Sequence, residues 1–184
     1  MSKMAKMVYH GTIEPKAINI LDIGFWNSTK PTEWLGMGVY FFDKCKDAET
    51  WAQKESQKRA GQLPAVLETT LKYNSLDFFD LDYLPNMEKF QEEMNVVLNE
   101  IGKNGEGAVD FSGKSDSEKR SKIRCFCCNY YKCEHNIKIM AYSFPAIHFN
   151  LVGFSFCTKQ RQYCVSDKTC IDNIVLKEAV DYAI

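Results

Sequence analysis

The sequence contains no apolar run of the length that a membrane-spanning helix requires. Such a helix needs about 18 or more consecutive apolar residues, and no apolar run in this chain approaches that length. The first residues, MSKMAKMVYHG, contain neither the apolar stretch nor the small-residue cleavage site of a secretory signal. These absences predict a cytoplasmic protein that has no membrane partner.

Neither sign of charge is in clear excess. The 184 residues include 23 Lys and Arg and 24 Asp and Glu, which gives a formal net charge of −1. A protein that binds nucleic acid mainly through many phosphate contacts carries a clear basic excess. That class is therefore disfavoured unless the chain forms a local basic patch. In a chain predicted to be cytoplasmic, the eight cysteines are expected to be reduced thiols.

Length and composition indicate one folded domain over residues 1–184. Apolar residues make up 45% of the chain and aromatic residues 13%, which is typical of a globular protein with a sizeable core. The periodicity of the apolar residues predicts a mixed α+β domain. The predicted strands are residues 8–10, 38–42, 66–73, 76–81, 137–144, 149–157 and 162–165. The predicted helices are residues 14–21, 48–55, 87–102 and 117–133, and the glycine-rich residues 102–116 are predicted to form a loop.

The stretch GMGVYFF, residues 36–42, places two glycines among bulky strand formers. Glycine weakens a strand interior because it has no side chain to pack and the most backbone freedom to lose. We interpret Gly36 and Gly38 as room for the backbone to approach a flat cofactor. Tyr40 is then either a core residue or one wall of a binding slot.

Two other stretches contain residue types that bind ligands. They are YHGT at residues 9–12, and QYCVSDKTCI at residues 162–171. Each has an ordinary structural explanation when taken alone, since a histidine at a strand end is commonly held by a hydrogen bond and a glutamine is commonly solvated. Their order relative to GMGVYFF, and the AETWA stretch at residues 48–52, make the combination more specific.

Together these motifs resemble the catalytic domain of the poly(ADP-ribose) polymerase and diphtheria-toxin class of ADP-ribosyltransferases, in particular its short bacterial members. In that class the first motif is His-Gly-Ser/Thr. The second is Gly-x-Gly-Ile/Val-Tyr-Phe with an aromatic residue eleven positions after the tyrosine, and the third begins Glu-Tyr. The matching residues are His10 to Thr12, Gly36 to Phe41 with Trp51, and Gln162 with Tyr163. The resemblance implies a split β-sandwich of two small antiparallel sheets with peripheral helices.

The resemblance also implies roles for individual residues, with NAD as a substrate. His10, Tyr40 and Gln162 would form the catalytic triad, and His10 would bond the ribose hydroxyls on the adenosine side. The remaining NAD-binding residues would be Gly11, Thr12, Gly38 and Trp51. The Gly11 backbone and the Thr12 hydroxyl would hold the carboxamide, while Tyr40 and Trp51 would sandwich the cationic pyridinium, an arrangement that aromatic stacking and cation–π attraction favour.

Gln162 departs from the glutamate of the class. An amide can orient a ribose hydroxyl, but it cannot act as a general base and stabilises less positive charge. This favours transfer of a single ADP-ribose unit to a macromolecular acceptor over chain elongation. Two alternatives remain: a module that binds NAD or ADP-ribose without turnover, and an enzyme similar to the RNA 2′-phosphotransferases, a class that relies on arginines and a basic RNA surface.

The segment CFCCNYYKCEH, residues 125–135, raises the question of a zinc site. Structural zinc sites usually present two separated ligand pairs, and this segment has no clean second pair. On a helix, Cys125, Cys128 and Tyr131 would share one face. Packing of these side chains is therefore the favoured interpretation, and no metal is expected.

Overall fold

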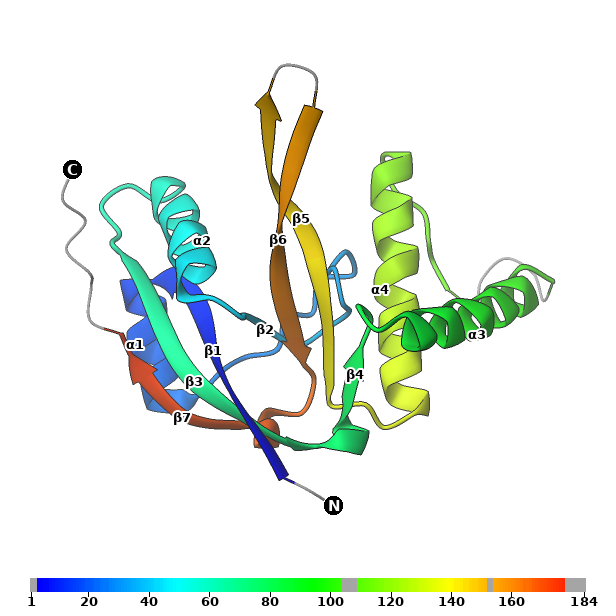
Figure 1. The fold of residues 1–184 in the computed structure, drawn as a ribbon, viewed down its shortest axis with the longest axis horizontal. Coiled ribbons are helices and arrows are strands. Elements are labelled where there is room, and N and C mark those ends of the chain that lie inside the picture. The colour runs from blue at the N-terminus through cyan, green and yellow to red at the C-terminus, as the bar shows by residue number, and fades with distance from the viewer. Residues whose placement is uncertain (1–2, 104–108, 152–153, 178–184) are drawn as a thin grey trace.

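One seven-stranded mixed sheet and four α-helices make up the structure, a computed structural model that describes residues 3–103, 109–151 and 154–177 (Figure 1). The strand order is β4-β5-β6-β2-β1-β3-β7, and only the β4–β5 pair is parallel. The strands are β1 (Lys3–Ile13), β2 (Val39–Phe42), β3 (Pro64–Asn74), β4 (Phe78–Asp80), β5 (Ile139–Leu151), β6 (Phe154–Val165) and β7 (Ile171–Leu176). The helices are α1 (Glu14–Ile23), α2 (Cys45–Gln57), α3 (Leu84–Lys103) and α4 (Asp116–Glu134), with short 3₁₀ turns η1 (Ser75–Asp77) and η2 (Lys168–Cys170). The α+β class and the four predicted helices are confirmed.

The expectation of two separate antiparallel sheets is wrong, because β2 connects the strands into one sheet. β2 pairs with β6 along its whole length, from Val39 opposite Val165 to Phe42 opposite Gln162. With β1, it shares a single register pair, Tyr9 opposite Phe42. The sheet therefore has a narrow waist between the group β4-β5-β6-β2 and the group β1-β3-β7.

The helices are distributed over both groups of strands, as Figure 1 shows: α1 and α2 lie beside β1 and β3, while α3 and α4 lie beyond β4 and β5. α1 ends at Ile23, two residues after its predicted end, and the following Gly24, which has a φ of 81°, donates its N–H to the Ile20 carbonyl. α3 begins at Leu84, three residues before the predicted start. Pro85 fits its first turn because the first helical N–H groups have no intrahelical partner. No helix in the described ranges combines the length and apolarity that crossing a membrane demands.

The second half of the chain differs from the prediction. Three expected strands are two long ones, β5 and β6, which pair from Ile139 opposite Val165 to Leu151 opposite Phe154 and form a hairpin that projects beyond the sheet (Figure 1). Residues 158–161, which separate two of the predicted strands, lie within β6, where a strand with a solvent-exposed face accepts polar side chains. The register shifts after Pro145, where a missing N–H is tolerated at an irregularity.

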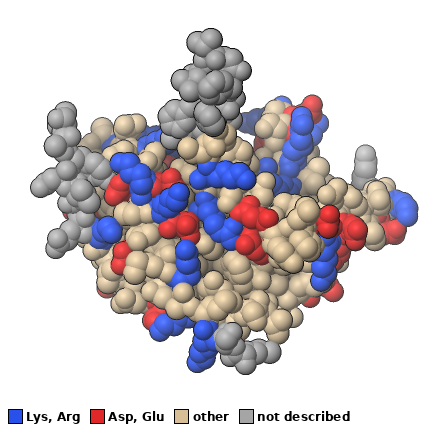
Figure 2. All heavy atoms as spheres, in the orientation of Figure 1, with Lys and Arg blue, Asp and Glu red and all other residues tan. Residues whose placement is uncertain are grey.

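β7 pairs with β3 at one edge of the sheet and has no counterpart among the predicted strands. Within the predicted loop 102–116, residues 104–108 lie outside the described ranges, and the described residues 109–115 contain no helix or strand. Acidic and basic side chains are interspersed over the face drawn in Figure 2, in keeping with the balanced charge of the chain.

Candidate functional site

A cavity of about 370 Å³ opens at the waist of the sheet. Its walls come from β1, β2, β6, the helices α1 and α2, and the segment between α1 and β2. All seven residues that the motifs single out as site residues line it: His10, Gly11, Thr12, Gly38, Tyr40, Trp51 and Gln162. Residues that are up to about 150 positions apart in the chain thus meet around one cavity. The volume of this cavity is within the size range of small-molecule sites.

The cavity exists because β1 and β2 diverge beyond their single register pair. The Glu14 N–H, at the end of the β1–β3 ladder, donates to the Leu63 carbonyl at 2.9 Å, so the backbone groups of Glu14 face β3. In an antiparallel ladder every second residue bonds the same neighbour. Gly11 lies three residues before Glu14 and belongs to the other set. The backbone N–H and C=O of Gly11 therefore point away from β3 and toward β2. Because the registered pairing between β1 and β2 ends at Tyr9 and Phe42, these two groups of Gly11 face the gap between the strands.

His10 bridges this gap with its side chain. Its Nδ1 lies 2.8 Å from the Tyr40 carbonyl oxygen, and the ring makes edge contacts with Phe25 and Phe41 at centroid distances of 5.1 and 5.9 Å. Desolvation lowers the pKa of His10, although the bond to Tyr40 works in the opposite direction. The ring is therefore neutral at pH 7 and Nδ1 is its donor, which leaves Nε2 as a hydrogen-bond acceptor.

Gly11 and Thr12 are fixed by packing on both sides of β1. A Cβ at Gly11 would lie 2.0 Å from the backbone carbonyl oxygen of Ala48, so helix α2 crosses directly over this residue. Thr12 is only 6% exposed, and it lines the cavity. Glycine is thus required at position 11 by the approach of the helix, and the same position leaves its backbone groups open toward β2.

The Tyr40 side chain lines the cavity and also makes two hydrogen bonds that hold the backbone before β2. Its hydroxyl accepts the Leu35 N–H at 2.8 Å and donates to the Gly36 carbonyl at 2.6 Å. Burial is the main cause of a raised pKa for Tyr40, so the hydroxyl stays protonated. Tyr40 therefore both lines the cavity and holds the chain that leads into β2.

Glycine is required at positions 36 and 38 for a different reason from the approach of a cofactor that was inferred from the sequence. Gly36 has a φ of 82°, and a Cβ there would lie 2.4 Å from Oδ1 of Asn129 on α4. A Cβ at Gly38 would lie 2.7 Å from both Sγ of Cys164 and the Val165 carbonyl oxygen on β6. Close packing of α4 and β6 explains both glycines, without any cofactor.

Trp51 on α2 and Gln162 on β6 also line the cavity. Trp51 is 47% exposed, and its ring lies 6.2 Å from that of Phe42 and 5.9 Å from Nζ of Lys58. Tyr40 and Trp51 line the same cavity, and their rings make no direct contact within the described part of the chain. The side-chain amide of Gln162 has no hydrogen bond to any described residue, so it is free to bind a ligand.

Several lining residues were not singled out from the sequence. They are the charged residues Lys16, Lys30, Glu33 and Glu55 and the aromatic residues Trp26 and Trp34. Most of them belong to the polar stretch NSTKPTEWLG or its immediate neighbours, which the sequence marks only as an exposed loop. The closeness of Glu33 and Trp34 to the glycine motif is the signal that could have identified them.

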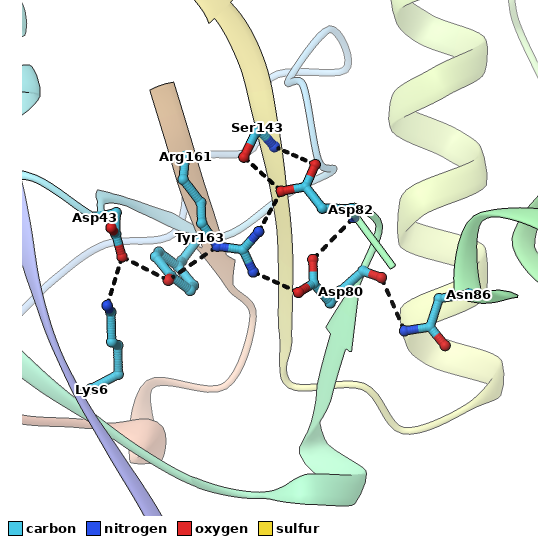
Figure 3. Close-up of polar contacts among 8 residues, drawn as sticks. All are labelled: Lys6, Asp43, Asp80, Asp82, Asn86, Ser143, Arg161 and Tyr163. Atoms are coloured by element: carbon cyan, nitrogen blue, oxygen red, sulfur yellow. Dashed lines mark hydrogen bonds and ion pairs between the residues drawn. The ribbon is translucent and has the colours of Figure 1, made fainter. Parts of the chain in front are cut away.

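A polar network on β6 lies beside the site (Figure 3). Arg161 pairs with Asp80 at 2.8 Å and with Asp82, and it donates to the Tyr163 hydroxyl at 3.2 Å. The Tyr163 hydroxyl in turn donates to Asp43 at 2.9 Å. Because side chains alternate along a strand, this network and Gln162 lie on opposite faces of β6. The network ties β6 to β4 and to the residue that follows β2, and so fixes the strand that presents Gln162.

The cysteine-rich helix packs as predicted. Cys125, Cys128 and Tyr131 are each at most 2% exposed, and the nearby His135 binds the Glu93 carboxylate at 2.8 Å. Within the described ranges, no three His, Cys, Asp or Glu side chains are grouped in a way that could hold a metal ion.

Comparison with known proteins gives no relative: no protein-family model, no curated protein and no solved structure matches this chain.

Proposed function

We propose that the protein transfers one ADP-ribose unit from NAD to a macromolecular acceptor and releases nicotinamide. The observation that carries this proposal is that His10-Gly11-Thr12, the Gly38-Val39-Tyr40 part of the glycine motif, Trp51 and Gln162 all line one cavity. The narrow waist of the sheet, where β1 and β2 part, supports a finer assignment as an ADP-ribosyltransferase-like split sheet with NAD in the gap.

The nicotinamide end of NAD fits the part of the cavity near Gly11. The outward N–H and C=O of Gly11 are complementary to the carbonyl and amino groups of a carboxamide, because both partners present one donor and one acceptor. The Thr12 hydroxyl lies next in the chain to support the same group. The exposed face of Trp51 and the ring of Tyr40 supply π-surfaces that favour the pyridinium cation over neutral nicotinamide.

The remaining polar groups suit the ribose and phosphate portions. The free Nε2 of His10 can accept a hydrogen bond from a ribose hydroxyl, and the amide of Gln162 can both donate to and accept from such a group. Lys16 and Lys30 also line the cavity, where their charges would complement a pyrophosphate.

In the reaction, the bond between the anomeric carbon and the nicotinamide nitrogen breaks, and its electron pair leaves with nicotinamide. Positive charge develops on the ribose, so the site accelerates the step if it holds negative or dipolar groups near that carbon. The neutral Gln162 can orient the ribose but cannot accept the proton of the acceptor.

The test is incubation of the protein with NAD that carries a label in the adenine. We expect release of nicotinamide and a labelled macromolecule, and loss of both in His10→Ala. Absence of both products from the wild type would refute the proposed transfer. The neutral Gln162 favours one other candidate, a binding module, which would show a rise in Tm with NAD but no nicotinamide.

A further inference from the structure

Two carboxylates line the cavity, and their surroundings differ. Glu55 on α2 is paired with Lys58 at 2.7 Å and with Arg59 at 4.0 Å. The hydrogen bond to Lys58 is the main cause of its lowered pKa, and its charge is largely compensated. Glu33 accepts a hydrogen bond from the Ser28 hydroxyl, and it has no ion pair with any described residue.

Glu33 is held in place through the glycine motif. Ser28, which binds its carboxylate, exchanges two backbone hydrogen bonds with Gly38, at 2.9 and 3.2 Å. Ser28 thereby takes the place along β2 that β1 leaves free where the two strands diverge. The Glu33 carboxylate is thus connected to β2, the strand that carries Tyr40, through its hydrogen bond with Ser28 and the backbone hydrogen bonds between Ser28 and Gly38.

Contacts on the other side of Glu33 hold the same segment. The Tyr40 hydroxyl binds Leu35 and Gly36. Arg124 on α4 lies 4.1 Å from the Trp34 ring centroid and donates from Nε to the Trp34 carbonyl at 3.2 Å. A carboxylate that is fixed from both sides in this way is preorganised, which is the property that catalytic groups require.

We propose that Glu33 is the catalytic carboxylate of this site and takes the part that Gln162 cannot perform. This inference rests on the proposed ADP-ribosyl transfer. As the bond from the anomeric carbon to nicotinamide breaks, the negative charge of Glu33 stabilises the positive ribose. As the acceptor O–H or N–H group attacks that carbon, Glu33 takes its proton. The products are ADP-ribosylated acceptor and neutral nicotinamide, and the proton passes from Glu33 to solvent.

The assignment also gives Tyr40 a clear part in the site. Its hydroxyl is a positioning group, because it binds the two residues that follow Trp34 and so limits the movement of Glu33. Gln162 orients the ribose from β6, while the carboxylate comes from the segment before β2. In the ADP-ribosyltransferase class that the motifs resemble, one glutamate both orients the ribose and acts as the catalytic carboxylate. Here these two functions would be divided between Gln162 and Glu33.

The test uses Glu33→Gln with Glu88→Gln as the control, because Glu88 is an exposed glutamate on α3 that does not line the cavity. The glutamine can still accept the Ser28 hydrogen bond, so the segment should keep its position. We expect Glu33→Gln to bind NAD in calorimetry with a Kd within about threefold of wild type, and to release nicotinamide about 100-fold more slowly, the usual loss on removal of a general base. Glu88→Gln should release nicotinamide within about threefold of the wild-type rate, because its side chain is exposed and lies outside the cavity.

The outcomes separate this inference from the proposed function. A wild-type protein that binds NAD without releasing nicotinamide refutes the transfer, and with it the catalytic part of Glu33. An active wild type with an equally active Glu33→Gln refutes the Glu33 assignment alone. Loss of NAD binding in Glu33→Gln also overturns it, because the carboxylate would then act in binding rather than in the chemical step.

Discussion

Tyr40→Phe separates the structural part of Tyr40 from its part as a cavity wall. The substitution keeps the aromatic ring and removes only the hydroxyl, which accepts the Leu35 N–H and donates to the Gly36 carbonyl. Leu35 is 2% exposed, so its N–H would be left without a partner away from water. The Gly36 carbonyl keeps a weak partner in the Cys164 thiol, 3.5 Å away.

The expected cost follows from these two groups. An unsatisfied buried donor costs about 1–3 kcal/mol, and loss of one bond to a carbonyl that keeps another partner costs less, so the free energy of unfolding should fall by about 2–3 kcal/mol. For a chain of this length, that corresponds to a fall in Tm of about 4–12 °C. Urea denaturation gives the free energy, and calorimetric titration with NAD shows whether binding persists.

The control is Tyr83→Phe. Tyr83 is 60% exposed, so loss of its hydroxyl should change the stability by less than about 0.5 kcal/mol. NAD binding by Tyr40→Phe should persist, because the ring that lines the cavity is unchanged, while nicotinamide release should slow as the segment carrying Glu33 loosens. If Tyr40→Phe were as stable as the wild type, the structural account of the hydroxyl would be refuted.

Three further predictions concern stability. Gly11→Ala should destabilise the fold by about 2 kcal/mol or more in urea denaturation, because its Cβ would lie 2.0 Å from the Ala48 carbonyl oxygen and helix α2 must move; an unchanged midpoint would contradict the packing. Arg161→Lys should lower the unfolding free energy by about 1–3 kcal/mol, since lysine cannot bond Asp80, Asp82 and Tyr163 together; a loss no larger than that of Arg59→Lys would show that the network adds nothing. Burial lowers the pKa of His10 in the folded state, so the unfolded chain takes up the proton first as the pH falls below about 6.5. The stability of the wild type should therefore decline from about pH 7.5 to pH 5 more steeply than that of His10→Gln. Equal slopes of Tm against pH for the two proteins would exclude a desolvated His10.

The helices could be predicted because each carries its own local signal. The apolar stripe of α3 and the glycine that ends α1 depend only on nearby residues. The sheet was harder, because strand pairing depends on residues that lie far apart. Residues 158–161 separate two predicted strands, and the pairing of β6 with β5 shows that they continue a single strand. The single-residue junction of β1 and β2 likewise has no local sequence signal.

The site shows the same division. Three short motifs were enough to select seven residues that line one cavity, although their roles toward NAD remain predictions. The reason for the glycines was not predictable, because the atoms that exclude a side chain belong to Asn129, Cys164 and Val165, at least 90 residues away. Glu33 was overlooked because the stretch around it is polar and turn-rich, and its closeness to the glycine motif is the single local signal that it lies beside the strand that follows.

The pairing of β2 also bears on the order in which the protein folds. One wall of the cavity, β2, is aligned by β6, which lies about 120 residues further along the chain. Closing so long a loop costs somewhat more entropy than closing the shorter loop between β1 and β3, so β2 and β6 are expected to pair after the local units α1, α2 and the β1–β3 ladder have formed. During synthesis the cavity would then remain incomplete until β6 has emerged from the ribosome. A nascent chain would therefore hold the His10 and Tyr40 motifs without the part of the cavity wall that Gln162 supplies until the domain has folded.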